Sequence, residues 1–447
     1  MGSYSVPLII RRNKTSVRVK WCVILLISVS IYLFSKQIST IPNNNDQLSI
    51  NSLIKDHTNP TILLWKDPFG AGISGFSSQH CNQYCNFEIG HWLFGPSKQQ
   101  IQEADAVIIH VLWSKGPSLI TQLFTDTLEQ IRKDGKLLIF LQSESPFYRF
   151  NRKPAERFFR RNKIEYSMTY KLDSSFPRPY GSIMLSKIKA IELSFKNTKP
   201  WLLSDFEINK KYRQHINMVF EHDKIQGAIS LISNCKGYKR GEVIKFFDKY
   251  FKWKNGTKAI DVFGKCQKKY QPVASEIRLT SLKPSSHSLE KTSKFIGRYF
   301  FTLAFENSNC QDYITEKFFE NAYVSGTVPV LMGQSRKTYQ KHAPGESFVH
   351  IDDFEGDWGK LVKYLQYYIE RPEEYRKKFF GWIDNGDSYN QTAFNDLKSV
   401  SNDFGVCKLC KVLKNMQSYD LEDLKHKDIN NWWNNNACES YHDSIFS

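Results

Sequence analysis

The apolar positions in the first half of the chain predict a strand, a helix and a second strand. Residues 106–112 and 136–141 are almost continuously apolar, as buried parallel strands are. Between them, apolar side chains recur at helical spacing and end before the stop signal Gly135: Leu119, Ile120, Leu123, Phe124, Leu128 and Ile131. This order predicts a βαβ unit. Residues 142–146 then follow the carboxyl end of its second strand, where ligands bind in open parallel sheets.

The second half of the chain repeats this pattern. Four apolar runs predict strands, at residues 228–232, 259–263, 299–305 and 327–332. Helical patterns lie between them and continue at residues 358–369 and 372–382, where Pro372 suits a first helical turn. The fold class is therefore α/β. We place two domains and a C-terminal tail at residues 61–215, 216–393 and 394–447.

One segment near the N-terminus is apolar enough to enter a bilayer. Residues 21–35 lie between Lys20 and Lys36, and residues 1–20 carry several basic side chains and no acidic one. This bias predicts that residues 1–20 stay in the cytosol. A cleaved signal peptide and a buried core helix are the alternatives, but no small-x-small cleavage site follows and the segment has no polar face. We expect a single-pass anchor, a flexible stem at residues 36–60 and a lumenal remainder.

Composition narrows the class of protein. The chain has 447 residues, a hydrophobic content of 41% and a mean hydropathy of -0.47, which excludes general disorder and a polytopic membrane protein. A net charge of +17 and 14% aromatic residues leave a nucleic-acid or polyanion binder as an alternative. The basic residues are spread along the chain, and a lumenal protein does not meet nucleic acid, so we expect no nucleic-acid partner. A heparin-like polyanion stays open as a partner.

Eight cysteines follow the expected anchor, which itself contains Cys22. They are Cys81, Cys85, Cys235, Cys266, Cys310, Cys407, Cys410 and Cys438. An even number in an oxidising lumen favours disulfides, whose connectivity spacing alone does not fix. The alternative is a zinc site, since the first two and Cys407 with Cys410 could supply four thiolates. Two sequons make Asn255 and Asn390 candidate N-glycosylation sites.

The polar loop after residues 299–305 is the stretch most informative about chemistry. It leads into an expected helix, so it could present backbone amides to a phosphate, with Asp312 as the candidate N-cap. Glu316 and Lys317 then lie in the first turn, where a carboxylate can hold sugar hydroxyls and an ammonium can neutralise a diphosphate. An ordinary strand–helix joint, with both side chains on a solvated face, is the alternative.

Glu144 and Arg240 are two further candidates. Glu144 follows the carboxyl end of an expected strand and could act as a general base, whereas the alternative is a solvated loop glutamate. Arg240 precedes a helical run and could bind a diphosphate, whereas the alternative is a surface arginine. The sequence contains no Asp-x-Asp triple, so we expect that the chemistry requires no metal and we assign no metal ligand.

These stretches resemble the α1,3-fucosyltransferases of glycosyltransferase family 10. The family's hallmark, Phe-Glu-Asn-Ser followed after a short gap by Asp-Tyr-Ile-Thr-Glu-Lys, stands here at residues 305–308 and 312–317. The resemblance covers most of the chain after residue 61. It includes shorter matches at residues 179–181, 233–235, 261–264, 328–330, 347–354 and 407–410.

The resemblance implies a GT-B arrangement of two Rossmann-like domains, the first on the acceptor side and the second binding GDP-fucose. It implies transfer with inversion at the anomeric carbon and makes Glu144 the catalytic base. The residues implied to contact GDP-fucose are Arg240, Asn307, Tyr313, Glu316 and Lys317. The resemblance also implies an N-glycan or glycoprotein acceptor and a location in the Golgi membrane. It implies that Mn²⁺ stimulates the reaction without being required for it.

Two features resemble the core type within the family, which fucosylates the innermost GlcNAc of N-glycans. They are Cys310 in the hallmark gap and a late segment at residues 429–433 that Cys438 follows. The alternatives are the Lewis type, which acts on N-acetyllactosamine or LacdiNAc antennae, and a non-catalytic glycan-binding relative. The resemblance also suggests the disulfides Cys310–Cys438 and Cys235–Cys266, which leaves Cys81 and Cys85 for Cys407 and Cys410.

Overall fold

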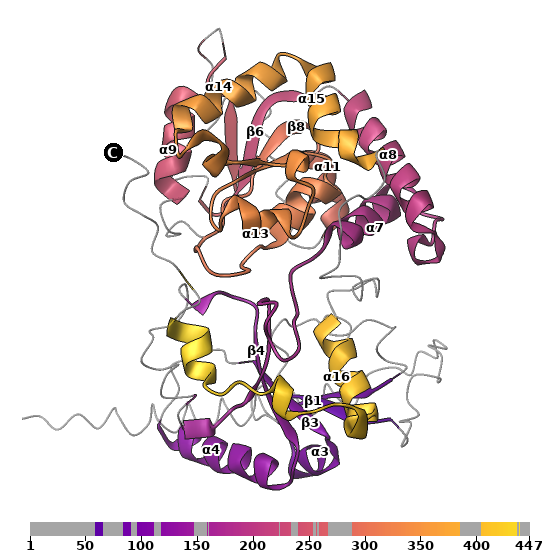
Figure 1. Cartoon of the computed structure of the whole chain (residues 1–447), viewed down its shortest axis with the longest axis vertical. Helices are drawn as coiled ribbons and strands as arrows, with labels where there is room; N and C mark the ends of the chain where they lie inside the picture. The colour runs from indigo at the N-terminus through magenta and orange to yellow at the C-terminus, as the bar shows by residue number, and fades with distance from the viewer. Residues whose placement is uncertain are drawn as a thin grey trace, which may run out of the picture. The chain divides into compact units, whose positions relative to one another are not determined.

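The chain forms two parallel five-stranded β-sheets with helices packed against them (Figure 1). This is seen in a computed structural model, and it confirms the predicted α/β class. The structure describes residues 59–65, 84–90, 96–110, 118–146, 159, 161–222, 224–233, 240–253, 256, 259–266, 288–384, 404–435 and 438. The expected anchor at residues 21–35 lies outside these ranges, within which no helix is long and apolar enough to cross a membrane.

The first sheet has the strand order β2-β1-β3-β4-β5 with parallel pairing throughout. Its strands are β1 (Thr61–Leu64), β2 (Asn86–Ile89), β3 (Ala106–His110), β4 (Leu137–Gln142) and β5 (Tyr166–Thr169). The predicted βαβ unit is confirmed, because α4 (Ser118–Lys133) connects β3 to its parallel neighbour β4. Gly135 follows the helix with a φ of +73°, a left-handed conformation that glycine adopts without strain.

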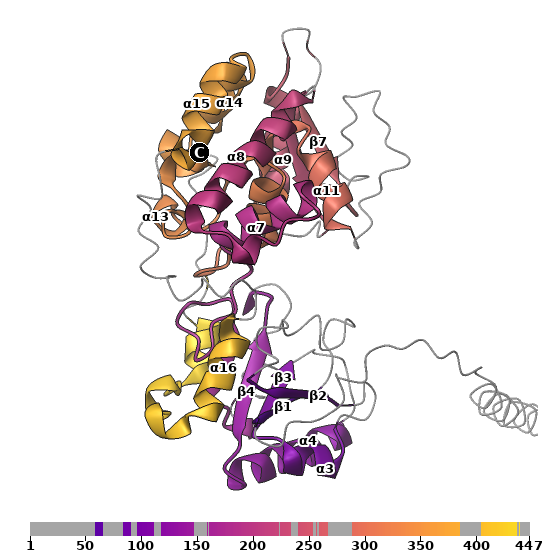
Figure 2. The same ribbon diagram turned by 90° about the vertical axis from the view of Figure 1, so that its right-hand side faces the viewer.

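Successive side chains of this sheet enter two different cores, as the alternation of a β-strand requires. Val107 belongs to the core that α4 and α3 (Lys98–Glu103) cover. Ile108 points the other way and packs in the core that contains Leu409 of α16 (Phe404–Lys414). A helix from near the C-terminus therefore covers one face of the first sheet (Figure 2).

The second sheet has the strand order β10-β9-β8-β6-β7, again with parallel pairing. Its strands are β6 (Ile225–Leu231), β7 (Ile260–Phe263), β8 (Tyr299–Leu303), β9 (Val328–Leu331) and β10 (Val349–His350). All four predicted strands are present with slightly shifted ends. The edge strand β10 has only two residues, too few to show a hydrophobic period.

Helices pack on both faces of the second sheet. They include α9 (Arg240–Tyr250), α11 (Leu289–Ile296), α13 (Arg336–Gln340), α14 (Trp358–Ile369) and α15 (Pro372–Phe380). On one face, Phe295 of α11 meets Phe263 of β7 with ring centroids 4.9 Å apart, and Figure 2 shows α11 beside β7. In the other core, Phe247 of α9 lies 6.0 Å from the ring of Trp358. The predicted helices at 358–369 and 372–382 are confirmed as α14 and α15, and Pro372 begins α15 as expected.

Two further helices, α7 (Ile183–Ser194) and α8 (Asp205–Glu221), contribute to the core of the second sheet. Tyr212 of α8 is fully buried there, and its hydroxyl donates a 2.9 Å hydrogen bond to the carbonyl of Tyr323. The domain boundary expected between residues 215 and 216 falls inside α8.

The C-terminal tail is built into the first sheet's cores. Trp433 is buried, with its ring centroid 5.4 Å from Phe140 of β4 and 5.7 Å from Tyr170 after β5. A disulfide joins Cys410 of α16 to Cys85 before β2. The tail is thus part of the folded body.

We expect Trp433→Ala to lower the free energy of unfolding by about 3–5 kcal/mol, because it opens a large cavity between Phe140 and Tyr170. Trp432→Ala is the matched control, because that neighbouring ring is only partly buried and should cost less. Urea denaturation under oxidising conditions measures both. A loss below about 1 kcal/mol for Trp433→Ala would show that the tail does not support this core.

Candidate active site

Glu144 lies two residues after the end of β4, where the sequence predicted it. It is half-buried, in a loop that the buried side chain of Gln142 organises. The Gln142 Oε1 atom accepts hydrogen bonds from the backbone amides of Ser143 and Glu144, each 3.0 Å long. The loop is therefore an ordered turn at the carboxyl end of a central parallel strand, and not an irregular loop exposed to solvent.

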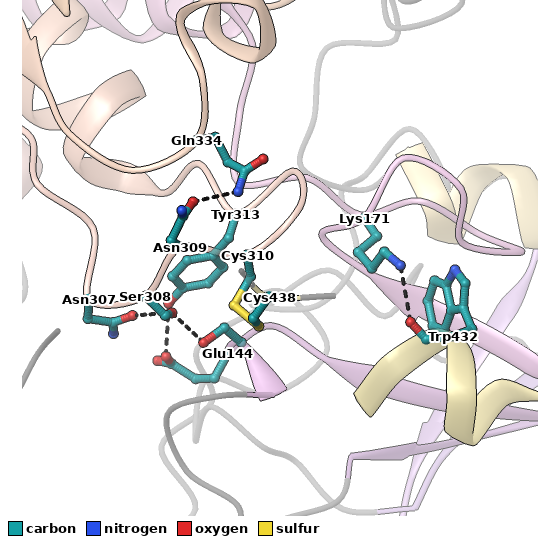
Figure 3. Close-up of a disulfide and its surroundings, with 11 residues drawn as sticks. Glu144, Lys171, Asn307, Ser308, Asn309, Cys310, Tyr313, Gln334, Trp432 and Cys438 are labelled. Carbon is teal, nitrogen blue, oxygen red and sulfur yellow. Dashed lines mark hydrogen bonds between the residues drawn. A yellow bond between two sulfur atoms is a disulfide. The ribbon is translucent and has the colours of Figure 1, made fainter. Parts of the chain in front are cut away.

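Tyr313 of the hallmark contacts Glu144 directly. Its hydroxyl donates a 3.1 Å hydrogen bond to Glu144 Oε2, and burial raises the pKa of Tyr313 well above its ordinary value (Figure 3). Two more tyrosines surround it. The ring of Tyr180 lies 6.1 Å away and its hydroxyl donates to the Ser143 carbonyl at 2.8 Å, while the ring of Tyr170 lies 4.9 Å away. Glu144 thus sits beside a cluster of neutral phenols.

The hallmark loop differs from the prediction at Asp312. The short helix α12 (Glu316–Phe318) has Thr315 as its N-cap, so the prediction of Asp312 in that role is wrong. Asp312 instead adopts a left-handed φ of 59°, and its carboxylate accepts a 3.1 Å hydrogen bond from the Leu172 amide. Aspartate tolerates this conformation better than most residues, so Asp312 shapes the turn that presents Tyr313.

Lys317 lies between two carboxylates. Its Nζ is 3.2 Å from Glu306 Oε2 and 3.1 Å from Glu316 Oε1, and its side chain is only 14% exposed. Burial alone would lower the pKa of Lys317, but the two carboxylates raise it to about 12. Burial alone would raise the pKa of Glu316, but Lys317 together with hydrogen bonds from the backbone and Thr315 outweighs burial, and the pKa lies below its ordinary value. Lys317 is not on a solvated face, whereas the Glu316 side chain is 45% exposed.

Glu306 was not singled out from the sequence. Its side chain is 2% exposed, and Oε1 accepts hydrogen bonds of 2.8 Å from both the amide and the hydroxyl of Thr315. Burial raises the pKa of Glu306, and Lys317 only partly offsets that rise. The sequence did offer a signal. Glu306 directly follows the apolar run that ends at Phe305, and a charge at such a buried position needs a partner.

Arg240 is buried at the start of α9, so the alternative of a surface arginine is wrong. Its Nη1 atom donates a 3.2 Å hydrogen bond to the Phe305 carbonyl, and its charge acts against protonation of Lys317. Two cations are therefore held near each other at the end of β8, an arrangement that suits an anionic ligand such as a diphosphate.

Asn307 and Ser308 occupy the turn between these groups, and both are buried. The Ser308 hydroxyl donates a 2.9 Å hydrogen bond to Asn307 Oδ1. The structure therefore brings five of the six predicted site residues onto or beside one loop and joins the sixth, Glu144, to it through Tyr313.

The described cysteines are disulfide-bonded, which excludes the zinc alternative for Cys85, Cys407 and Cys410. Cys310 pairs with Cys438, as the resemblance suggested, and Cys85 pairs with Cys410. Cys266 is also disulfide-bonded. Among the described residues, no group of three or more His, Cys, Asp or Glu side chains could hold a metal ion. The predicted residues that lie outside the described ranges are Cys81, Cys235, Asn255 and Asn390.

Two family models match the chain. The model described as "Fucosyltransferase, N-terminal" matches residues 57–181, and "Glycosyltransferase family 10 (fucosyltransferase) C-term" matches residues 221–432. Together they account for most of the described body. This chain belongs to glycosyltransferase family 10, the fucosyltransferases, which confirms the prediction of a glycosyltransferase.

Curated relatives agree with this assignment. The chain is 26% identical to Glycoprotein 3-alpha-L-fucosyltransferase A of Drosophila melanogaster over 273 residues, which is 60% of this chain and 43% of that protein. It is 25% identical to Alpha-(1,3)-fucosyltransferase fut-5 of Caenorhabditis elegans over 68% of this chain and 66% of that protein. It is 25% identical to 4-galactosyl-N-acetylglucosaminide 3-alpha-L-fucosyltransferase FUT6 of Homo sapiens over 90% of this chain and 92% of that protein. These matches thus span less than half of the fly protein and just under two thirds of the worm protein.

Among solved structures, an alpha-glucosyltransferase in complex with UDP and a 13-mer DNA is similar with a TM-score of 0.43. The identity is 11%, and the similarity covers 78% of this chain and 100% of that chain. At this level the similarity says nothing about ligands or activity.

Proposed function

We propose that this protein is an inverting α1,3-fucosyltransferase that moves L-fucose from GDP-β-L-fucose to O3 of a GlcNAc. The observation that carries the proposal is the 3.1 Å hydrogen bond from Tyr313 of the hallmark to Glu144, which brings the expected base beside the expected donor residues. Family membership and relatives named as 3-alpha-L-fucosyltransferases support the same reaction.

In the proposed reaction, the Glu144 carboxylate takes the proton of the acceptor O3 hydroxyl. The O3 oxygen attacks C1 of fucose as the bond from C1 to the GDP oxygen breaks, so the configuration at C1 inverts and GDP leaves with the bonding electrons. The charge that grows on the β-phosphate needs cations, and Lys317 and Arg240 supply two that are already held in place. Glu316 is partly exposed, and its carboxylate, paired with Lys317 through Oε1, can accept hydrogen bonds from fucose hydroxyls.

We propose the innermost GlcNAc of N-glycans as the acceptor. In support, the Cys310–Cys438 disulfide joins the late segment typical of the core type to the hallmark loop, three residues before Tyr313. The names of relatives include a glycoprotein type and a 4-galactosyl-N-acetylglucosaminide type at almost equal identity, so similarity does not choose between acceptors. The same proposal places the enzyme in the Golgi lumen on the single anchor expected at residues 21–35.

The deciding experiment incubates the full chain in detergent with GDP-fucose and two acceptors in parallel, a trimmed N-glycopeptide and free N-acetyllactosamine. Transfer to the innermost GlcNAc of the glycopeptide supports the full proposal. Transfer to N-acetyllactosamine alone would keep the reaction and move the acceptor to the Lewis type. Binding of GDP-fucose without transfer to either acceptor would favour a non-catalytic glycan-binding protein.

We expect transfer to continue in the presence of EDTA. Lys317 and Arg240 supply the positive charge that a metal supplies in enzymes with an Asp-x-Asp triple, which this sequence lacks. Mn²⁺ added after the chelator should at most stimulate turnover, through release of GDP. Initial rates with and without EDTA measure this, and complete loss of transfer in EDTA would show that a metal is required.

A further inference from the structure

The loop that carries Glu144 is held at each of three consecutive residues. The Gln142 side chain accepts hydrogen bonds from the amides of Ser143 and Glu144, and Tyr180 donates to the Ser143 carbonyl. The third hold is on Ser145, which is fully buried and whose hydroxyl is hydrogen-bonded to the Ser308 hydroxyl. This hydrogen bond joins the loop to Ser308, the neighbour of the expected donor contact Asn307, in addition to the bond from Tyr313 to Glu144.

The direction of these hydrogen bonds follows from the proton count. A serine hydroxyl has one proton, and the geometry gives the proton of Ser308 to Asn307 Oδ1 at 2.9 Å. Ser145 must therefore donate to Ser308. The acceptor role of Asn307 Oδ1 turns its amide NH₂ group away from Ser308, so the Asn307 side chain has one defined orientation (Figure 3).

We propose that Ser308 is a positioning residue. It couples the loop that carries Glu144 to the hallmark loop through the hydrogen-bond relay Ser145→Ser308→Asn307. The proposal rests on the proposed function, in which Glu144 is the base and Asn307 contacts GDP-fucose. One end of the relay fixes the residue after Glu144, and the other end fixes the side-chain amide of Asn307, the expected donor contact. A small rotation of either loop breaks one of the two hydrogen bonds inside a buried environment, which is costly.

We expect loss of the Ser145–Ser308 bond and loss of the Ser308–Asn307 bond to have different kinetic effects. Loss of the Ser145 bond loosens the position of Glu144, which matters only in the transition state and lowers kcat. Loss of the Ser308 hydroxyl also frees the Asn307 amide to turn, which weakens the donor contact. The relay therefore predicts that Ser145→Ala changes kcat alone, whereas Ser308→Ala changes kcat and also raises KM for GDP-fucose.

The test compares Ser145→Ala, Ser308→Ala and the double variant with the full-length protein in detergent, using the better of the two acceptors above. We expect kcat to fall about tenfold in each single variant and no further in the double variant, because one relay is broken in all three. We expect KM for GDP-fucose to rise about threefold or more in Ser308→Ala and the double variant, and to stay unchanged in Ser145→Ala. Ser293→Ala is the matched control, a buried serine that donates a 3.1 Å hydrogen bond to the Val324 carbonyl away from the site.

Thermal unfolding of all four variants separates kinetics from stability. We expect Ser293→Ala to lose about as much stability as Ser145→Ala but to keep the wild-type kinetics. If Ser145 acted only by stabilising the fold, the two variants would have the same kinetics. Two outcomes would overturn the relay in a wild-type protein that transfers fucose. One is a wild-type kcat in Ser145→Ala, and the other is a fall in kcat in the double variant that equals the product of the falls in the two single variants. A wild-type protein without transfer overturns the proposed function and the relay together.

Discussion

Glu144→Gln should lower kcat for fucosyl transfer by about 10²- to 10⁴-fold, the usual contribution of a general base. The amide cannot take the proton of the acceptor hydroxyl, but its oxygen can still accept the 3.1 Å hydrogen bond from Tyr313. The backbone bonds from Ser143 and Glu144 to the Gln142 side chain do not depend on the carboxylate. The substitution therefore removes the base and leaves its surroundings in place.

The control for this substitution is Glu165→Gln, at an exposed glutamate directly before β5 of the same sheet. We expect it to keep the wild-type kcat. Glu144→Gln should also bind GDP-fucose with the wild-type Kd, because the cations expected to meet the diphosphate are unchanged. More than about a tenth of the wild-type kcat in Glu144→Gln would mean that another group takes the proton.

The parts of the fold that sequence predicted well are those with a strong local signal. The unit β3, α4 and β4 shows continuous apolar strands and a glycine stop, and Pro372 marks the start of α15. The position of Glu144 could be predicted for the same reason, because a parallel strand fixes where its carboxyl end lies.

Other features depend on contacts between segments far apart in the sequence. Asp312 looked like a helix cap, but its carboxylate finds the Leu172 amide, 140 residues away, and the cap passes to Thr315. The burial of Arg240 and Glu306 likewise depends on packing around the hallmark loop. It could not be predicted, because the neighbouring sequence is the same whether such a charged residue is buried or exposed. Local periodicity also cannot tell which sheet α8 packs on, which is why the expected boundary fell inside it.

Lys317→Met should abolish detectable transfer and also destabilise the fold by about 3–5 kcal/mol. Methionine keeps the length of the side chain but leaves the ionised Glu306 carboxylate buried without its cation, 2% exposed. The activity loss follows from the loss of a cation at the leaving diphosphate, and the stability loss follows from the unpaired charge. Transfer assays and urea denaturation measure the two effects separately.

The double variant Lys317→Met, Glu306→Gln separates these causes. A neutral amide at position 306 can still accept the hydrogen bonds from Thr315, so most of the lost stability should return while transfer stays absent. If transfer returned with stability, Lys317 would act only through folding.

The pH dependence of the single variant tests the same electrostatics. Burial raises the pKa of Glu306 above its ordinary value of 4.5, and the loss of Lys317 removes the largest opposing effect. The folded state of Lys317→Met then takes up a proton at a higher pH than the unfolded state, so its stability deficit relative to wild type should shrink as the pH falls from 7 toward 4.5. The double variant has no carboxyl at position 306 and should show no such recovery. A deficit in Lys317→Met that is constant over this range would mean that Glu306 is not the source of the instability, and that the ion pair with Lys317 does not stabilise the hallmark loop.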